Sequence, residues 1–374
     1  MSYSGLYIHI PFCLTKCRYC NFASEELSNY SELKTYIQTM TIEIKNRSPG
    51  KIDTIYFGGG TPSICEPKQI DLLLREIAKK SLISSKVEIT LEVNPATVDR
   101  KKLIALKKIG INRLSLGIQS CQDKNLKFLG RKHNAKQAKN TFQLAREVGY
   151  SNIGVDLIYG LPCQNLLDFQ RDLSELLTWQ PDHISLYALS IEPNTLLAEE
   201  VASSKHLKIS DDLVADMYIW ASEYLVEKKF QHYELSNFSL LGKFSKHNLK
   251  YWTGVPYVGI GAAAHSFIKS TRSWNFSDYQ SYIKKILASG NAKKGEEKLK
   301  ENEKISEALI VGLRVIKGIS KKKLLQKFGE RWQEKFSQIF VKLKTEGLLI
   351  ENKDYISLTP RGRLLSNVVF RELI

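Results

Sequence analysis

The sequence CLTKCRYC at residues 13–20 decides the fold, and it follows YIHIPF at residues 7–12, which has the pattern of a short strand ended by a proline. The spacing CxxxCxxC places three cysteines close together on a loop. Three thiolates can hold three irons of a cubane cluster, and the fourth iron then stays open to a small molecule. We therefore predict an iron–sulfur cluster bound by Cys13, Cys17 and Cys20, at a site suited to chemistry or ligand binding.

Other interpretations of the cysteine loop are weaker. A disulfide is disfavoured in a chain with the features of a cytosolic protein. A zinc ion needs a fourth ligand, and nearby His9 falls in the middle of the predicted strand, whereas zinc ligands usually come as two closely spaced pairs. Cys65, Cys121 and Cys163 have no partner at motif spacing, so we expect them to be small, buried apolar residues.

The composition is that of a globular protein with an unusual charge. The 374 residues are 43% hydrophobic and 25% charged, and the net charge is +16. Such a charge favours an acidic partner, namely an anionic cofactor, a membrane surface or nucleic acid, although most of the lysines fit a solvated surface. The sequence has neither a signal-peptide pattern nor an apolar run of membrane-spanning length, and a cluster needs a reducing compartment. We therefore expect a cytoplasmic protein.

Strand-like and helical patterns alternate from Leu6 to about Ser190. The predicted strands are Leu6–Ile10, Thr54–Phe57, Val87–Val93, Arg113–Gly117, Ile153–Ile158 and His183–Ala188. The predicted helices between them are Tyr30–Lys45, Asp71–Lys79, Asp99–Lys107, Asn134–Glu147 and Leu167–Leu177. Repeated strand–helix units predict an α/β fold with a parallel sheet, as an open or partial barrel of six units. In such barrels the site lies at the carboxyl ends of the strands.

Polar residues follow several of the predicted strands at that edge. The run GGGTPS at residues 58–63 follows the second strand, and its glycines allow a close approach of backbone to ligand. Glu92, Gln119 and Asp156 follow or end later strands, and Arg131 begins the region of the next helix. A carboxylate among apolar strand residues usually serves ligand hydroxyls or cations, because an unpaired buried charge is costly. The alternative is structural ion pairing, with Arg113 or Arg146 as the partner.

The motif CxxxCxxC, the string YIHIPFC and the run GGGTP resemble the radical S-adenosylmethionine (SAM) superfamily, in its coproporphyrinogen-dehydrogenase-related branch. The resemblance covers the chain from Tyr7 to about Ser190 and implies a partial (β/α)6 barrel with a [4Fe-4S] cluster whose open iron is chelated by SAM. It also implies positions around SAM. These are Tyr7 and Tyr19 beside the cluster, Gly59, Gly60, Thr61, Glu92 and Arg131 at the aminoacyl end, Gln119 and Asp156 at the ribose, and Ile158 and Ser190 flanking adenine.

The motif HNLKYW at residues 247–252 joins a histidine to two aromatic side chains. An imidazole beside flat rings suits an iron porphyrin, with the ring nitrogen at the axial site. From the residues alone, a structural histidine with Tyr251 and Trp252 in the core is the favoured alternative. The motif CxxCH does not occur in the sequence, so covalent heme attachment of the c type is not indicated.

The composition changes in the last part of the chain. We expect a barrel over residues 1–230, a connecting region over 231–295 that carries HNxxYW, and a winged-helix-like α+β domain over 296–374. Residues 291–304 look like a linker or a solvated helix. Three helices, a hairpin around residues 352–354 and a last helix from Pro360 suggest the winged helix. Winged helices often bind nucleic acid, but in the resembled branch a similar module packs beside the substrate, and we favour that role.

Two departures distinguish members of this branch. The porphyrinogen-oxidising enzymes carry a fourth cysteine where this sequence has Phe22, and they have a long N-terminal extension before the position of Tyr7. The motif HNxxYW instead resembles the HemW-type heme chaperones. That resemblance implies heme as a third cofactor, with His247 as a candidate ligand. Asn21 stands where aspartate is usual, and Ala263 replaces a glycine before Ala264 and His265.

Three functions follow from these observations. If the protein is a heme chaperone, we expect heme uptake, a heme acceptor protein as partner and no porphyrinogen turnover. An oxygen-independent coproporphyrinogen dehydrogenase predicts turnover, and a radical SAM enzyme acting on RNA predicts salt-sensitive RNA binding. We favour the first, expect no coproporphyrinogen dehydrogenase activity and expect no nucleic-acid partner. A reductant protein, a homodimer and a peripheral membrane contact stay open.

Overall fold

The computed structural model describes residues 3–162, 164–203 and 210–374, which form two compact units. Unit 1 comprises Met1–Met217 and Pro256–Glu297, and unit 2 comprises Tyr218–Val255 and Lys298–Ile374. Residues 231–295, predicted as one connecting region, are therefore divided between the two units. None of the helices within the described ranges has the length and apolar character needed to cross a membrane.

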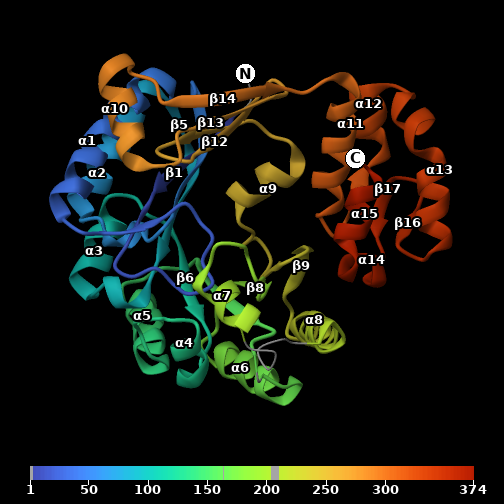
Figure 1. Cartoon of the computed structure of the whole chain (residues 1–374), viewed down its shortest axis with the longest axis horizontal. Coiled ribbons are helices and arrows are strands. Elements are labelled where there is room, and N and C mark those ends of the chain that lie inside the picture. The colour runs from blue at the N-terminus through green and yellow to red at the C-terminus, as the bar shows by residue number, and fades with distance from the viewer. Residues whose placement is uncertain (1–2, 163, 204–209) are drawn as a thin grey trace. The chain divides into compact units, whose positions relative to one another are not determined.

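Unit 1 is built from six parallel strands, each followed by a helical segment (Figure 1). The strands are β1 (Ser4–Ile10), β4 (Lys51–Gly59), β5 (Leu82–Val93), β6 (Arg113–Gln119), β7 (Ile153–Tyr159) and β8 (His183–Ala188), side by side in that order. The helices are α1 (Tyr30–Arg47), α2 (Pro67–Lys80), α3 (Arg100–Lys108), α4 (Asp123–Phe128), α5 (Ala135–Glu147), α6 (Leu166–Thr178) and α7 (Leu196–Ser203). The predicted partial α/β barrel is confirmed.

The apolar pattern of the sequence explains this architecture. The stripe predicted for α1 is buried, with Leu33, Tyr36, Ile37, Met40 and Ile44 at most 1% exposed. Asn29 caps the first turn of α1 by accepting a hydrogen bond from the Ser31 backbone amide at 2.9 Å. Strand–helix units of this kind bury the strands on both faces.

The sheet of unit 1 extends beyond the six units, which the sequence analysis did not predict. Strand β11 (Tyr257–Ile260) adds parallel to β1, and β12 (His265–Ile268), β13 (Thr271–Asn275) and β14 (Lys293–Lys298) follow in order. Helix α10 (Tyr279–Ser289) connects β13 to β14. The interpretation of residues 291–304 as a linker or solvated helix is wrong for 293–298, because these residues join the edge of the sheet. Two short strands, β2 (Phe12–Cys13) and β3 (Glu25–Glu26), pair separately around the cysteine loop.

Unit 2 has its own core. Its elements include the β9–β10 hairpin (Gln231–Glu234, Asn237–Ser239), α9 (Lys246–Thr253), α11 (Glu301–Leu313), β15 (Ile319–Ser320), α12 (Lys321–Phe328), α13 (Arg331–Thr345), β16 (Leu349–Glu351), β17 (Tyr355–Leu358), α14 (Pro360–Leu364) and α15 (Ser366–Glu372). Helix α8 (Asp211–Glu227) crosses the boundary between the units. Three helices and the β15–β17–β16 sheet give the winged-helix order. Leu235 from the first segment of unit 2 belongs to the same buried cluster as Leu309, Phe336 and Leu358 from the second.

Candidate functional site

The cysteine loop begins where β1 ends, at the carboxyl edge of the parallel strands. The Thr61 hydroxyl donates to Cys13 Sγ at 3.4 Å, and Arg131 Nη1 donates to Cys17 Sγ at 3.4 Å. The Arg18 backbone amide donates to the Leu129 carbonyl at 3.4 Å, which holds the loop against the segment after α4. Cys13 and Cys17 therefore each have a hydrogen-bond donor at their sulfur, which suits the anionic sulfurs of a cluster.

The three thiols lie close enough to influence one another. Burial raises the pKa of the Cys13 and Cys20 thiols, and the charge on the neighbouring cysteines adds to the rise. Bound irons would supply the positive charge that makes three adjacent thiolates stable. Among the described residues, no group of three imidazole, thiol or carboxyl side chains could hold a metal ion as placed. A cubane cluster does not need three ligands around one metal ion, because each cysteine binds a different iron. Three thiols on one loop are the donor set for that kind of cluster.

The remaining cysteines do not join this site. Cys65 is 1% exposed, and burial raises the pKa of its thiol to about 12, so the thiol is protonated. Cys121 is half-buried, and burial raises the pKa of its thiol too. The prediction for Cys163 concerns a position outside the described residues.

The glycine run is fixed against the cysteine strand. The backbone amides of Gly60 and Thr61 donate to the carbonyls of Ile10 and Phe12, both at 2.8 Å. A Cβ on Gly60 would lie 2.7 Å from the Phe12 carbonyl oxygen, so the close approach requires glycine. Because the amides are used internally, the carbonyls of this loop are the groups that can receive a ligand amino group.

Glu92 lies beside the glycine run and accepts two hydrogen bonds. The Tyr56 hydroxyl donates to Glu92 Oε1 at 2.8 Å, and the Gly59 amide donates to Oε2 at 3.3 Å. Burial raises the pKa of Glu92 to about 7, and nearby Asp156 adds to the rise, while the two hydrogen bonds oppose it. The Tyr7 ring stacks on Tyr56 with centroids 6.1 Å apart. These contacts bring Tyr7, Gly59 and Glu92 into one group.

A second group forms around Gly117 in β6. Gln119 has a φ of 68° at the point where the register of β6 against β7 shifts. Such a shift redirects a side chain and is frequent beside functional sites. A Cβ on Gly117 would lie 3.0 Å from Gln119 Nε2 and 3.3 Å from Arg131 Nη2. Arg131 also donates to the Gly117 carbonyl at 2.8 Å and to Cys17, so this group reaches the cysteine loop.

Asp156 is half-buried on β7, directly opposite Gly117 in the sheet. Burial raises the pKa of Asp156, while hydrogen bonding to Ser185 and Ser115 and the Arg113 guanidinium oppose the rise. Arg113 is 1% exposed and also opposes the rise at Glu92. This buried guanidinium favours the charged form of both carboxyl groups.

The positions predicted to flank adenine are further along the same edge. Ile158 is 5% exposed and lies in a small apolar cluster with Leu129 and Leu161, against which Tyr19 packs. Ser190 is exposed, and its hydroxyl donates to Glu192 Oε1 at 2.5 Å. Glu192 also accepts a hydrogen bond from Asn21 Nδ2 at 3.4 Å. Glu192 therefore links Ser190 to the residue that follows the cysteine loop.

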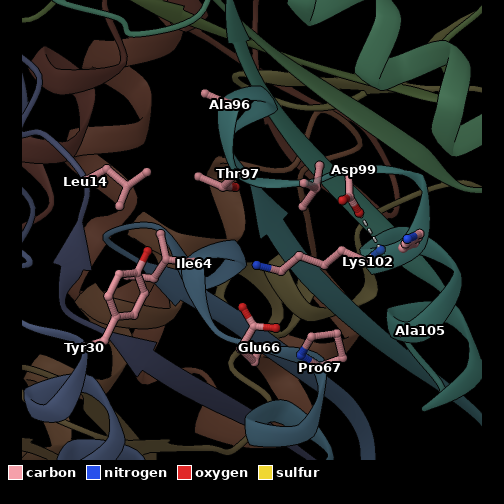
Figure 2. A pocket seen from close by; sticks show the side chains of 12 residues that line it. Leu14, Tyr30, Ile64, Glu66, Pro67, Ala96, Thr97, Asp99, Lys102 and Ala105 are labelled. Carbon is pink, nitrogen blue, oxygen red and sulfur yellow. Dashed lines mark hydrogen bonds between the residues drawn. The ribbon is translucent and has the colours of Figure 1, made fainter.

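A pocket of about 640 Å³ lies beside the cysteine loop, outside both groups (Figure 2). Leu14 and Tyr30 form one side, and the segments after β4 and β5 with the start of α3 form the other. Figure 2 shows the Lys102 side chain reaching into it near Glu66. None of the predicted SAM positions lines this pocket.

His247 lies in unit 2, on α9, and is 1% exposed. Its Nε2 is 2.9 Å from the Tyr251 hydroxyl, and the two rings meet edge to face at 5.2 Å. Trp252 stacks with the Arg314 guanidinium, whose central carbon lies 4.4 Å from the ring centroid. The motif HNxxYW thus packs within unit 2, as the structural interpretation expects.

Three residues of the site were not predicted from the sequence. Tyr56 lies inside a strand, where an aromatic residue gives no signal of its own. Arg113, considered from the sequence as an ion-pair partner of the strand carboxylates, is buried near Glu92 and Asp156. Gly117 was predicted only as the end of a strand, and Gly58 only as one member of the glycine run. A Cβ on Gly58 would meet Tyr56, Glu92 and Tyr7 at 2.9–3.1 Å, so this glycine leaves room for the first group.

Comparison with known proteins identifies the family and the fold. Residues 7–176 match the model of the radical SAM superfamily, and residues 299–365 match the HemN C-terminal domain. The chain is 34% identical to the heme chaperone HemW of Bacillus subtilis, over 97% of each chain. It is 33% identical to the heme chaperone HemW of Lactococcus lactis, over 99% of this chain and 97% of that one. The structure of coproporphyrinogen III oxidase (HemN) from Escherichia coli superposes with a TM-score of 0.86 at 22% identity, covering 99% of this chain and 90% of that chain, and so shares the fold.

Proposed function

The chain belongs to the HemW family of the radical SAM superfamily, and from this premise we propose that it is a heme chaperone, which binds heme and passes it to an acceptor protein. The observation that carries the proposal is the similarity to two heme chaperones over nearly the whole chain, both units included. A [4Fe-4S] cluster and SAM are the cofactors that membership of the superfamily implies. We place the protein in the cytoplasm, with a reductant protein, a homodimer or a peripheral membrane contact as further associations to test.

The residues of unit 1 have distinct parts in this proposal. The cluster, when bound, supplies an open iron as the site for SAM. Cys13, Cys17 and Cys20 hold the cluster, and Arg131 donates to one of their sulfurs. The glycine run and Glu92 receive the amino end of SAM. Gln119 and Asp156 receive the ribose hydroxyls, and Ile158 lies against the base.

Coproporphyrinogen dehydrogenation is the second candidate, favoured by the shared fold with HemN. At 22% identity that likeness extends to the fold alone. In place of a fourth cysteine, the loop carries Phe22, which is 69% exposed. A thiol at that place would be an additional redox or ligand group, and a phenyl ring offers neither.

One experiment separates the two functions. After anaerobic reconstitution of the cluster, the same sample is titrated with heme, mixed with an apo-hemoprotein, and incubated with coproporphyrinogen, SAM and reductant. The proposal predicts a Soret band on titration, transfer of heme to the acceptor and no protoporphyrinogen. Turnover of the porphyrinogen without heme uptake would instead support the dehydrogenase.

The pKa of Glu92 gives a test of the SAM site. A carboxyl with a pKa of about 7 is charged above that pH and neutral below it, and the charged form is the better acceptor for an amino group. We expect the affinity for SAM to fall as the pH drops below about 7, by up to tenfold per pH unit. Calorimetry across this range measures the effect.

The matched control is Glu92→Gln, which keeps the shape of the side chain and cannot titrate. This variant should bind SAM more weakly than wild type at high pH and with little dependence on pH. A wild-type affinity that is flat across the same range would show that Glu92 does not contact the amino end.

A further inference from the structure

The face of the sheet that carries Tyr7, Tyr56 and the Glu92 contact continues across β11, β12 and β13. Register partners on neighbouring strands lie on the same face. Tyr7 is opposite both Tyr56 and Gly259, and Tyr257, two residues before Gly259, is opposite Phe267. Phe267 is in turn opposite Arg272, and His265 is opposite Trp274. The side chains on this continuation, which we call the extension face, are Tyr257, His265, Phe267, Arg272 and Trp274.

The opposite face of the same strands is buried where it meets α1, at Ser266, and exposed at Ile268. Ser266 is 2% exposed, and Arg47 of α1 donates to its hydroxyl at 3.2 Å. On the extension face, His265 is exposed and the other four side chains are half-buried. Aromatic and cationic groups are thus accessible on the face that also carries Tyr7.

His265 is the exposed histidine among the residues that the structure describes. Of the seven histidines, His206 lies outside the described ranges, and His9, His133, His183 and His247 are at most 5% exposed. His232 is half-buried and stacks on Phe238 at 4.1 Å. A carrier must take up and release its cargo, and an exposed histidine can reach the iron without a conformational change that would slow uptake.

The surroundings of His265 hold its ring in place. Its imidazole stacks on the Trp274 indole, with centroids 6.1 Å apart and planes 27° apart. Gly295 of β14 leaves room for the indole, since a Cβ there would lie 2.6 Å from the Trp274 ring. Within the described part of the chain, neither ring nitrogen of His265 has a hydrogen-bond partner, whereas Nε2 of His247 meets a hydroxyl.

The charge and position of the extension face suit one kind of ligand. Arg272 pairs with Glu297 at 3.5 Å on the surface, and its five N–H donors can serve a second carboxylate. The end of β11 lies beside β1, since Ile260 is opposite Ile8, and His265 begins the next strand a few residues later. Burial is the larger cause of the lowered pKa of the His9 imidazole, and His265 is near enough to contribute to it.

We propose that the extension face is where heme docks, with His265 as the iron ligand, Trp274 as the residue that orients its imidazole and Arg272 as the partner of a propionate. This inference rests on the proposed heme-carrier function and adds a binding site to it. It assigns Tyr257 and Phe267 to the apolar surface beside the macrocycle, and it gives His247 a structural role in unit 2.

The test uses the full chain with its cluster reconstituted, titrated with hemin and followed at the Soret band. His265→Ala should weaken heme binding by at least about tenfold, the scale on which lost metal contacts reduce affinity. His265→Cys should restore binding with a shifted Soret band, because a thiolate replaces the imidazole. Ile268→Ala is the matched control, since Ile268 is exposed on the same strand but on the other face. Retained iron content and SAM binding in each variant show that unit 1 is folded.

The outcomes distinguish this inference from the function on which it rests. A wild-type protein that takes up no heme overturns the proposed function itself. If wild type binds heme and His265→Ala binds it equally, with an unchanged Soret band, the extension face is not the site. Loss of the Soret band in His247→Ala together with its retention in His265→Ala would move the ligand to unit 2.

Discussion

Replacing Cys17 by alanine should remove the cluster and, with it, tight SAM binding. Two thiolates cannot fix a cubane that three hold, and the open iron for SAM would be lost with the cluster. Cys17 Sγ also receives the Arg131 hydrogen bond, so the guanidinium would lose its anionic partner and its hold on the loop. We expect the iron content after anaerobic reconstitution to fall close to zero, measured by iron assay together with the charge-transfer absorbance of the cluster.

Cys65→Ala is the control for this experiment. Cys65 is as buried as a core residue, and a thiol with a pKa of about 12 is protonated at neutral pH. The variant should therefore keep a full complement of iron and bind SAM as wild type does. Iron that persists in Cys17→Ala and disappears in Cys65→Ala would refute the assignment of the ligands.

Replacing Glu43 by alanine should destabilise unit 1 by about 3–5 kcal/mol, the usual result of removing one partner of a buried ion pair. Glu43 is fully buried on α1, and its carboxylate pairs with Arg47 at 2.5 Å. It also accepts from the Gly261 amide at 2.8 Å, from the Tyr282 hydroxyl at 2.7 Å and from Asn275 Nδ2 at 2.8 Å. Truncation removes the acceptor of the Gly261 amide and of the Tyr282 hydroxyl, and it removes the charged partner of Arg47. These contacts lie in the segment that fixes the extension strands to α1.

Urea unfolding followed by circular dichroism measures this loss. The control is Asp71→Ala. Asp71 and Arg75 form an ion pair with the same spacing of four residues, but on the surface of helix α2. That pair should contribute less than about 1 kcal/mol, because solvent screens it. Equal losses in the two variants would mean that the Glu43 network adds nothing beyond an exposed ion pair.

Local patterns predicted the six parallel strands and the five longer helices between them, to within a few residues at most ends. The stripe on α1 and the apolar runs of the strands are periodic signals that depend only on neighbouring positions. Strands β11–β14 were missed for the opposite reason. Tyr257–Ile260 becomes a strand because β1 offers it an unpaired edge, and Lys293–Lys298 is so polar that only its place beside β13 makes it a strand. Long-range pairing of this kind leaves no local pattern to read.

The candidate site likewise combines local features, which the sequence predicts, with features that depend on long-range contacts, which it does not. Cysteines at a fixed spacing and a glycine run are local, so their positions followed from the sequence. The way Gln119 and Arg131 converge over Gly117 depends on a register shift between two strands. The burial of His247 depends on packing between segments far apart in the chain, and a motif that joins a histidine to aromatic residues cannot tell a ligand from a core residue.

The division of unit 2 into two segments constrains how the protein is made. Residues 218–255 leave the ribosome before residues 298–374 have been synthesised. Leu235 therefore cannot pack into its apolar cluster until the second segment has been made. During that interval its hydrophobic surface is open to aggregation and to binding by chaperones. A stop codon before Lys298 would therefore leave the His247 helix without its core, so a shortened chain is not a valid source of a barrel with an intact HNxxYW motif.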